Sequence, residues 1–179
     1  MALGTLPAVL MPAKAAHAAG RKILVACFSA TGTTKDAAEA IARALGGDLY
    51  EIRPQRPYTR ADLDWHDKAS RSSLEMADEK ARPAIAGPLP DMGPYGTVFI
   101  GYPIWWGIAP RIVQTFVDGC DLKGRTVIPF CTSGGSPFAQ SADRLAAAAP
   151  SAHWLPGRRL AAGTGEADIL AWAKDLGLK

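Results

Sequence analysis

The feature that most constrains the fold is the continuous apolar run Lys22–Phe28, which precedes a small hydroxyl-rich turn and a helical pattern. A run rich in branched residues is typical of a strand that is buried on both faces. In the segment after the turn, apolar residues recur at helical spacing until Gly46-Gly47, a pair that favours a helix end. The start of this region therefore predicts a strand–turn–helix unit.

The same alternation repeats along the rest of the chain. Further strands are expected at Leu49–Ile52, Thr97–Tyr102, Thr126–Phe130 and His153–Leu155, with a continuation of the last to Leu160 left open. Further helices are expected from Pro110 to Gly119, over Ala139–Ala148 and over Glu166–Leu176. Alternating strands and helices predict an α/β fold, a three-layer doubly wound five-stranded parallel sheet with strand order 2-1-3-4-5. Pro129 is expected to weaken the end of its strand.

One stretch does not follow the alternation. Pro54–Asp91 is long and polar, and no strand is visible in it, although Arg60–Lys80 is expected to hold one or two short helices. Long connections of this kind are uncommon and often functional. We therefore interpret residues 54–91 approximately as a polar insertion within one domain spanning residues 21–179.

Residues 1–20 differ from the rest, because they are apolar, alanine-rich and free of acidic side chains. Ala16-His17-Ala18 fits the small-x-small pattern of a signal-peptidase site, but the basic segment that begins a signal peptide is missing. We expect an exported, periplasmic protein whose true start lies upstream and carries twin arginines. The alternative is a cytoplasmic protein with a disordered N-terminal tail.

Charge and cysteine usage exclude several classes of protein. The net charge is +3 and arginine is spread along the chain, which argues against a nucleic-acid-binding arm. Ala2–Met11, the longest apolar candidate near the start, is about half of the ~20 residues that a membrane-spanning helix needs. The three cysteines form no CxxC pair, so neither a zinc ribbon nor a thioredoxin-type dithiol is expected.

In an open parallel sheet, ligands bind beyond the carboxyl ends of the strands, where the strand order reverses. Three loops occupy such positions here. The first consists of Ser29, Ala30, Thr31, Gly32, Thr33 and Thr34. The second consists of Pro103, Ile104, Trp105, Trp106 and Gly107. The third consists of Thr132, Ser133, Gly134, Gly135 and Ser136.

The first loop combines hydroxyl groups with backbone N–H groups at a helix N-terminus, where an anion is favoured. Neither GxxxxGK[ST] nor GxGxxG is present, so a monophosphate fits better than a nucleoside triphosphate. The alternative is an ordinary helix-capping turn.

The second loop carries two tryptophans, whose flat surfaces can stack on a planar ring system. The alternative is that both tryptophans pack under the following helix. In the third loop, glycines allow the backbone to approach a ligand closely, and amides and hydroxyls can bond the polar edge of a ring.

Two other classes of protein with the same topology are excluded because residues that they need are missing from this sequence. A response-regulator receiver needs clustered aspartates at its strand ends, and a low-molecular-weight phosphatase needs Cys-x5-Arg, but Thr33 follows Cys27 at the arginine position. Cys131 is expected to be a small buried residue, and His66 and His153 are not expected to hold a metal or donate a proton. No catalytic or metal-ligating residue is assigned.

The segments SATGTT, GYPIWWG and PFCTSGGS, in this order, resemble the phosphate loop and the two ring-binding loops of the flavodoxin-like family. The resemblance extends from Lys22 to the C-terminus, and YTRADLDW and SRSSLE resemble the insertion of one bacterial branch. It implies a non-covalent FMN with its phosphate on Ser29–Thr34 and its ring between the other two loops, near a hinge at Trp106-Gly107.

The resemblance implies an electron carrier that serves a redox partner protein. The alternative is an FMN-dependent oxidoreductase that passes electrons from NAD(P)H to a quinone-like small molecule, and a third is a non-redox interaction module. Two departures from well-known flavodoxins bear on this choice. The chain is mildly basic, and the Ser/Gly-rich third loop, with Phe138 as its nearest aromatic residue, leaves one ring face open.

Overall fold

The computed structural model describes residues 21–178, and the predicted signal-like segment, residues 1–20, lies outside them. The strands are β1 (Lys22–Cys27), β2 (Asp48–Glu51), β3 (Tyr95–Pro103), β4 (Thr126–Thr132), β5 (His153–Trp154) and β6 (Arg158–Arg159). The helices are α1 (Thr33–Leu45), α2 (Arg71–Ala77), α3 (Arg111–Gly119), α4 (Asp143–Ala148) and α5 (Glu166–Asp175). Within residues 21–178 no helix combines the length and the apolarity needed to cross a membrane.

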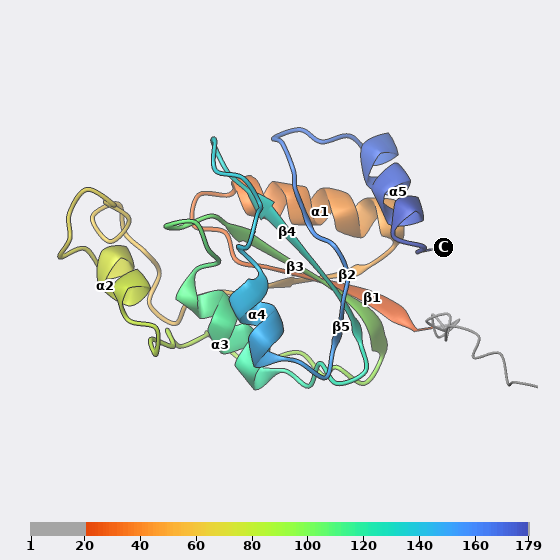
Figure 1. Ribbon diagram of the computed structural model, residues 1–179, viewed down its shortest axis with the longest axis horizontal. Coiled ribbons are helices and arrows are strands. Elements are labelled where there is room, and N and C mark those ends of the chain that lie inside the picture. The colour runs from red at the N-terminus through yellow and green to blue at the C-terminus, as the bar shows by residue number, and fades with distance from the viewer. Residues whose placement is uncertain (1–20, 179) are drawn as a thin grey trace, which may run out of the picture.

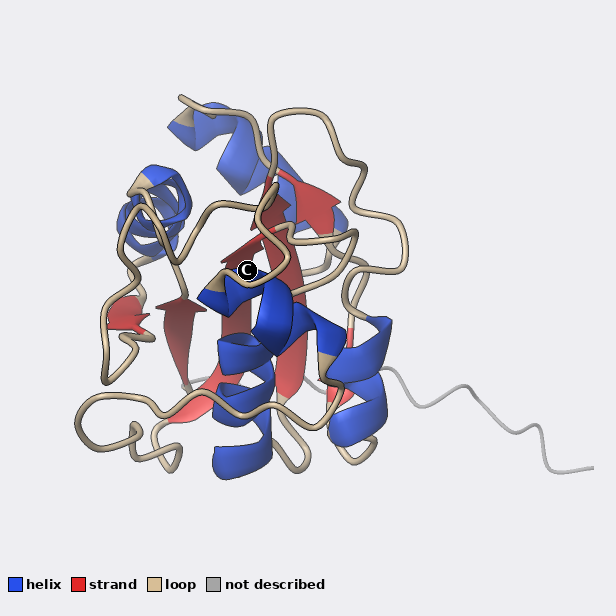
Figure 2. Ribbon diagram, turned by 90° about the vertical axis from the view of Figure 1, so that its left-hand side faces the viewer, coloured by secondary structure: helices blue, strands red, loops and turns tan. Residues whose placement is uncertain are grey.

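The strands form one parallel sheet in the order β2-β1-β3-β4-β5, which confirms the predicted topology. Helices α1 and α5 lie on one face of the sheet and α3 and α4 on the other (Figures 1 and 2). Successive side chains of a strand point to opposite faces, so both cores are supplied by the same strands. In β1, Leu24 packs into the cluster that contains Phe116 of α3, whereas Val25 packs into the cluster that contains Ile41 of α1.

The fifth strand is divided, which the sequence pattern did not resolve. β5 and β6 both pair with β4, one on each side of Pro129. The Val127 carbonyl accepts a hydrogen bond from the Leu155 amide at 2.9 Å, and the Cys131 carbonyl accepts one from the Leu160 amide at 2.8 Å. Alternate residues of a strand point their backbone groups to the same side, so Pro129 also faces β5 and β6, but it has no N–H to donate. Pro129 was expected to weaken the end of its own strand, but β4 continues through it to Thr132. The strand that is interrupted is the partner on the edge that Pro129 faces.

The fourth helix is shorter than predicted. The expected range began at Ala139, but residues 139–142 form turns and α4 begins at Asp143. Ala139 has a positive φ of 35°, which is incompatible with a right-handed helix. The alanine-rich composition predicted a helix from Ala139, but the helix begins only after the turn, at Asp143.

The insertion contains one short helix, α2, and an isolated antiparallel bridge between Pro54 and Ile85. The prediction of one or two short helices is confirmed, and the bridge was not visible in the sequence. The bridge brings the two ends of the insertion together beside the sheet, so the segment projects from the domain as a closed loop (Figure 1).

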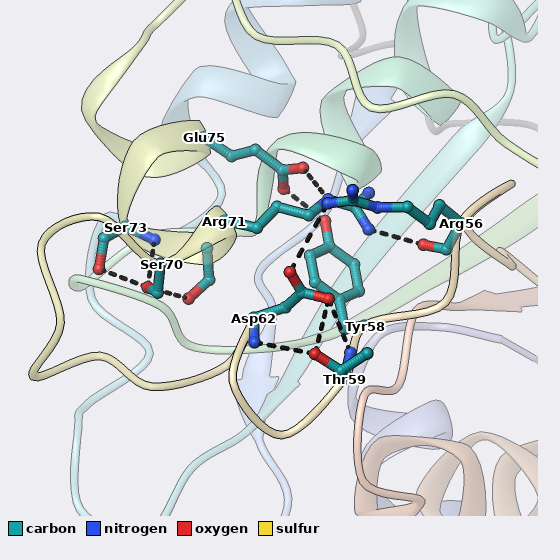
Figure 3. A network of polar contacts seen from close by, with 9 residues as sticks. Arg56, Tyr58, Thr59, Asp62, Ser70, Arg71, Ser73 and Glu75 are labelled. Atoms are coloured by element: carbon teal, nitrogen blue, oxygen red, sulfur yellow. Dashed lines mark hydrogen bonds and ion pairs between the residues drawn. The ribbon is translucent and has the colours of Figure 1, made fainter.

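Side chains organise the interior of this loop. Tyr58 Oη donates to Glu75 Oε2 at 2.5 Å, Arg71 Nε donates to Glu75 Oε1 at 2.6 Å, and the Arg71 guanidinium lies 4.1 Å from the centre of the Tyr58 ring (Figure 3). Arg71 also donates to the carbonyl of Arg56 at 2.7 Å. These contacts give a segment with little regular structure a defined conformation.

Candidate functional site

The three predicted loops meet at the carboxyl ends of β1, β3 and β4 and enclose one cavity of about 560 Å³. The predicted site residues that line it are Ala30, Thr31, Thr33, Thr34, Pro103, Ile104, Trp105, Thr132, Ser133, Gly134 and Gly135. Four other predicted residues, Ser29, Gly32, Trp106 and Gly107, are not among its lining residues. The strand order brings together segments that are about a hundred positions apart in the sequence.

The first loop is shaped by its own hydrogen bonds. Ser29 Oγ accepts a bond from the Gly32 amide at 3.1 Å, so this hydroxyl shapes the turn, and Ser29 is not among the residues that line the cavity. Gly32 caps α1 with φ of 98°, a conformation that favours glycine. Thr31 and Thr33 remain free to present hydroxyl groups, and the first turn of α1 supplies backbone N–H groups.

Two contacts connect the third loop to the others. The hydroxyl groups of Thr34 and Thr132 lie 2.7 Å apart and are buried, which ties the first loop to the third. The Ile104 amide donates to the Thr132 carbonyl at 3.3 Å, which ties the second loop to the third. Thr132 therefore holds the three loops in register, a structural role in addition to its place in the cavity wall.

The cavity has no charged or titratable side chain among its lining residues. Lys35, the cation nearest in sequence to the first loop, forms an ion pair with Glu51 at 3.1 Å, and this hydrogen bond raises the pKa of Lys35. An anion in the first loop would thus be held by amides, hydroxyls and the helix dipole. This donor set suits a phosphate group and offers no cation for a longer polyphosphate.

The second loop turns sharply at its centre. The amide and carbonyl groups of Trp105 and Ile108 exchange two hydrogen bonds, at 2.9 and 3.0 Å, and the two residues between them have positive φ values. Trp106 at 48° and Gly107 at 83° form a type I′ turn, which is unusual for a bulky residue such as tryptophan. The predicted hinge is therefore a site of backbone strain.

The two tryptophans of this loop have different roles. Trp105 packs edge-on against Phe28 and Tyr58, with ring centroids 5.5 and 5.3 Å apart, and also lines the cavity. Trp106 is 51% exposed and points into a neighbouring cleft. Trp105 thus packs on Phe28 and Tyr58 and lines the cavity, so ring stacking at this residue stays a prediction. Trp106, being half exposed, does not pack under the following helix as the alternative interpretation required.

The third loop leaves its backbone open. A Cβ atom added to Gly134 or Gly135 would meet no atom within 4 Å, so side chains would extend into free space beside the cavity. Ser133 Oγ accepts a bond from the Gly135 amide at 3.1 Å and shapes the turn. The glycines therefore leave space beside the backbone of this loop, whose Gly135 amide is already paired with Ser133.

Sequence reasoning missed three residues of the cavity wall: Leu63, Leu160 and Ala162. Ser136, the last residue of the third candidate loop, also lines the cavity. Leu160 and Ala162 follow β6, a strand end that the pattern did not resolve. Leu63 comes from the insertion, and nothing in its local sequence indicates that it reaches the sheet.

A second cleft of about 350 Å³ adjoins the first, with which it shares Leu63, Ile104, Trp105 and Ser136. Trp65 and Ser72 of the insertion and Trp106 of the second loop complete it. The insertion therefore forms one wall of a continuous site.

Neighbouring thiol and phenol groups are kept neutral by burial. Burial raises the pKa of Cys131, on the strand beneath the third loop, to about 11. Burial also raises the pKa of Tyr102, whose hydroxyl lies 3.1 Å from that of Ser141. Cys131 is a buried structural thiol, as predicted.

The residues present fit the cofactor that the resemblance implies. The volume lies within the ~300–1,000 Å³ range of small-molecule sites. A phosphate donor set lies at one loop, and an aromatic wall with an open glycine backbone lies at the others. FMN needs a site for a phosphate dianion and another for a flat, partly apolar ring.

Comparisons with known proteins agree with this reading of the fold. The family model described as flavodoxin matches residues 22–176. A search of curated proteins yields no match. A crystal structure of a protein from Bacteroides eggerthii, assigned as a flavoprotein, is similar with a TM-score of 0.85 and 55% identity over 89% of this chain and 99% of its own.

A second such protein, from Bacteroides uniformis, shares 50% identity over 87% of this chain and 99% of its own, with a TM-score of 0.82. A flavoprotein from Lactobacillus acidophilus in complex with FMN has the same fold, with a TM-score of 0.64 and 22% identity over 86% of this chain and 99% of its own. The fold and the family model together show that this chain belongs to the flavodoxin family.

Proposed function

We propose that the chain binds one FMN non-covalently in the cavity between its three loops and transfers electrons through it. The observation that carries this proposal is the convergence of a phosphate donor set, an aromatic wall and an open glycine backbone on one uncharged cavity of about 560 Å³. When bound, FMN supplies one- and two-electron redox chemistry.

In this proposal the protein's own groups do three things. Thr31, Thr33 and the amides at the start of α1 bind the phosphate. Ile104 and Trp105 provide an apolar wall that excludes water from the ring, while the amides of Ser133 and Gly134 bond its polar edge. The Thr34–Thr132 bond keeps these parts at a constant separation.

A second candidate is an oxidoreductase that passes electrons from NAD(P)H to a quinone-like acceptor. The observation in its favour is the second cleft, which opens directly from the cavity and is walled by two exposed tryptophans. A carrier that docks on another protein has no need of such a cleft.

The test of FMN binding is direct. The full chain, stripped of any flavin and titrated with FMN, should show the absorption of a bound flavin and quenching of its fluorescence at micromolar concentration. Failure to bind FMN in this range would remove the proposal. Steady-state oxidation of NADH and NADPH, with and without a quinone, then separates the carrier from the oxidoreductase.

Export to the periplasm is proposed separately, on residues 1–20 alone. Cell fractionation combined with mass spectrometry of the mature N-terminus tests it. A mature chain that begins at Ala19 in the periplasmic fraction would support export, and an intact Met1 in the cytoplasmic fraction would contradict it.

A further inference from the structure

Three aromatic rings meet at the wall of the proposed flavin cavity. Trp105 lines the cavity, and its ring lies edge-on to Phe28 at 5.5 Å and to Tyr58 at 5.3 Å. Phe28 and Tyr58 also contact each other, with ring centroids 5.7 Å apart. Neither of these two residues lines the cavity or the adjoining cleft, so their rings reach a ligand there only through Trp105.

The two aromatic neighbours of Trp105 are held by different parts of the chain. Phe28 directly follows β1 and is fully buried, so the sheet fixes its position. Tyr58 belongs to the insertion and is only partly buried, so its position depends on the side chains around it. The orientation of the Trp105 ring therefore depends on the insertion as well as on the sheet.

An ion pair with little exposure to solvent fixes Tyr58 (Figure 3). The Tyr58 hydroxyl donates to Glu75 at 2.5 Å, and Arg71 Nε donates to the same carboxylate at 2.6 Å. The Arg71 guanidinium also lies 4.1 Å from the centre of the Tyr58 ring. The side chains of Arg71 and Glu75 are only 13% and 15% exposed, so water competes little for these contacts. Tyr58 is thus held both at its hydroxyl and on one face of its ring.

We propose that Tyr58 is a positioning residue for the flavin, because it fixes the angle of the Trp105 ring and so the shape of the aromatic wall. The inference rests on the proposed function, since Trp105 contacts a flavin only if FMN occupies the cavity. A ring that is oriented before the ligand arrives loses less conformational entropy on binding than a ring that is free to turn. The insertion then acts on the cavity from behind its wall, in addition to contributing Leu63 to that wall.

Tyr58→Leu tests the inference in the full chain, because it keeps an apolar side chain and removes the ring and the hydroxyl. FMN binding should weaken by about threefold to tenfold, the equivalent of one aromatic pair. The visible circular dichroism of bound FMN should also change, because this signal reports the side chains around the flavin ring. Tyr58→Phe keeps the ring contacts and should restore both the affinity and the spectrum.

A double-mutant cycle with Trp105→Leu tests whether Tyr58 acts through Trp105. In the Trp105→Leu background, Tyr58→Leu should change the FMN dissociation constant by less than about twofold. A second measurement uses the flavin-free chain, in which the difference between the near-ultraviolet circular dichroism of the wild type and of Trp105→Leu isolates the Trp105 signal. Tyr58→Leu should alter that signal.

Tyr50→Leu is the matched control. Tyr50 is also partly buried, its ring lies 5.6 Å from that of Phe116, and its hydroxyl donates to the carbonyl of Pro88 in the insertion at 3.1 Å. It lines neither the cavity nor the cleft and does not contact Trp105 through its ring. The control variant should therefore lower the melting temperature and leave the FMN affinity and the visible circular dichroism unchanged.

Three results would overturn the inference and leave the proposed function standing. One is a Tyr58→Leu variant with the FMN affinity and the flavin spectrum of the wild type. Another is an equal loss of affinity with and without Trp105, because the insertion would then act on the flavin by another route. The third is the same loss in Tyr50→Leu, which would assign the effect to stability alone. A wild type that fails to bind FMN would overturn both proposals.

Discussion

The three loops at the sheet edge and the insertion of residues 54–91 form opposite walls of one site by different means. The loops consist of hydroxyls, amides and glycines at the ends of buried strands, and their lining residues carry no charge. The insertion has little regular structure and depends on side chains such as Tyr58, Arg71 and Glu75. One wall of the site is therefore fixed by the backbone of the sheet, and the other is fixed by contacts between side chains of the insertion.

The difference has consequences for how each region responds to mutation. A loop whose ends are buried strands keeps its shape when a surface side chain changes, so a substitution there acts on the ligand. An insertion held by a few side chains loses its shape when one of them is removed. Further contacts anchor it, since Arg111 donates to the Met76 carbonyl at 3.0 Å and Arg82 pairs with Asp118 at 2.6 Å.

The largest effect is expected in the first loop. Replacing both Thr31 and Thr33 with glutamate should weaken FMN binding by at least about a hundredfold, because two carboxylates would face the phosphate dianion. Both positions are exposed, so the circular dichroism spectrum and the melting temperature should stay close to those of the wild type. FMN fluorescence titration provides the measurement.

The matched control changes both threonines to serine, which keeps the hydroxyls and should retain most of the affinity. An affinity of the double-glutamate variant within a few-fold of the wild type would mean that this loop does not hold the phosphate.

The next effect is expected in the insertion. Tyr58→Ala removes a half-buried ring from its edge contacts with Phe28 and Trp105 and from beneath Arg71. We expect a loss of about 2 kcal/mol in the local stability of the insertion, below the value for a fully buried aromatic residue. Hydrogen exchange should show reduced protection in residues 58–78 and unchanged protection in β1 and β3.

If protection fell equally throughout the sheet, the insertion and the loops would not be separate units. Unchanged protection within residues 58–78 would mean that other contacts suffice to hold the insertion.

A smaller effect isolates the polar part of the same contact. Tyr58→Phe keeps the ring and removes the hydroxyl that donates to Glu75 at 2.5 Å. We expect a loss of about 1 kcal/mol, because a hydrogen bond to a charged acceptor is lost while Glu75 keeps its bond from Arg71. The same hydrogen-exchange experiment measures it, and a loss equal to that of Tyr58→Ala would assign the whole effect to the hydroxyl.

The smallest effect concerns alkaline pH and distinguishes the sheet from the insertion. Burial raises the pKa of the Cys27 thiol in β1 from 9.0 to about 12. The folded state therefore binds this proton more tightly, so its stabilising effect is complete below pH 9 and is lost as the pH rises toward 12. Burial also raises the pKa of Tyr58, and because its ordinary pKa of 10.0 lies above that of the thiol, the corresponding loss in the insertion begins only above about pH 10.

Urea unfolding at pH 8 and at pH 9.5 tests this difference. Between these values the wild type should lose about 0.8 kcal/mol more stability than Cys27→Ala, whatever the stability of the variant at pH 8. An equal pH dependence of the two proteins would contradict a buried, neutral thiol at this position.

Much of the architecture could be predicted from local pattern. The apolar runs at Lys22–Phe28 and Thr97–Tyr102 indicate buried strands because parallel strands are covered on both faces, and the strand order followed from their alternation with helices. The three loops followed in turn, since the carboxyl ends of parallel strands share one edge. Each of these inferences depends on neighbours in the sequence and on a general rule.

The missed features depend on partners far away in the sequence. Pro129 divides the fifth strand because its missing N–H faces that edge, and this is known only when the pairing is known. Leu63 lines the cavity because Tyr58 packs on Trp105 and holds the insertion against the sheet. Trp106, at the backbone turn, lines only the second cleft, whereas Trp105 lines both.

By itself, the sequence determined the periodicity of burial, the turns between elements and the kind of donor at each loop, because these are properties of adjacent residues. Only the tertiary structure decided how the insertion covers the sheet edge, which tryptophan lines which cavity, and that Thr34 and Thr132 join two loops. The physical reason is that such contacts form between side chains separated by tens of residues, whose encounter depends on the packing of the whole chain.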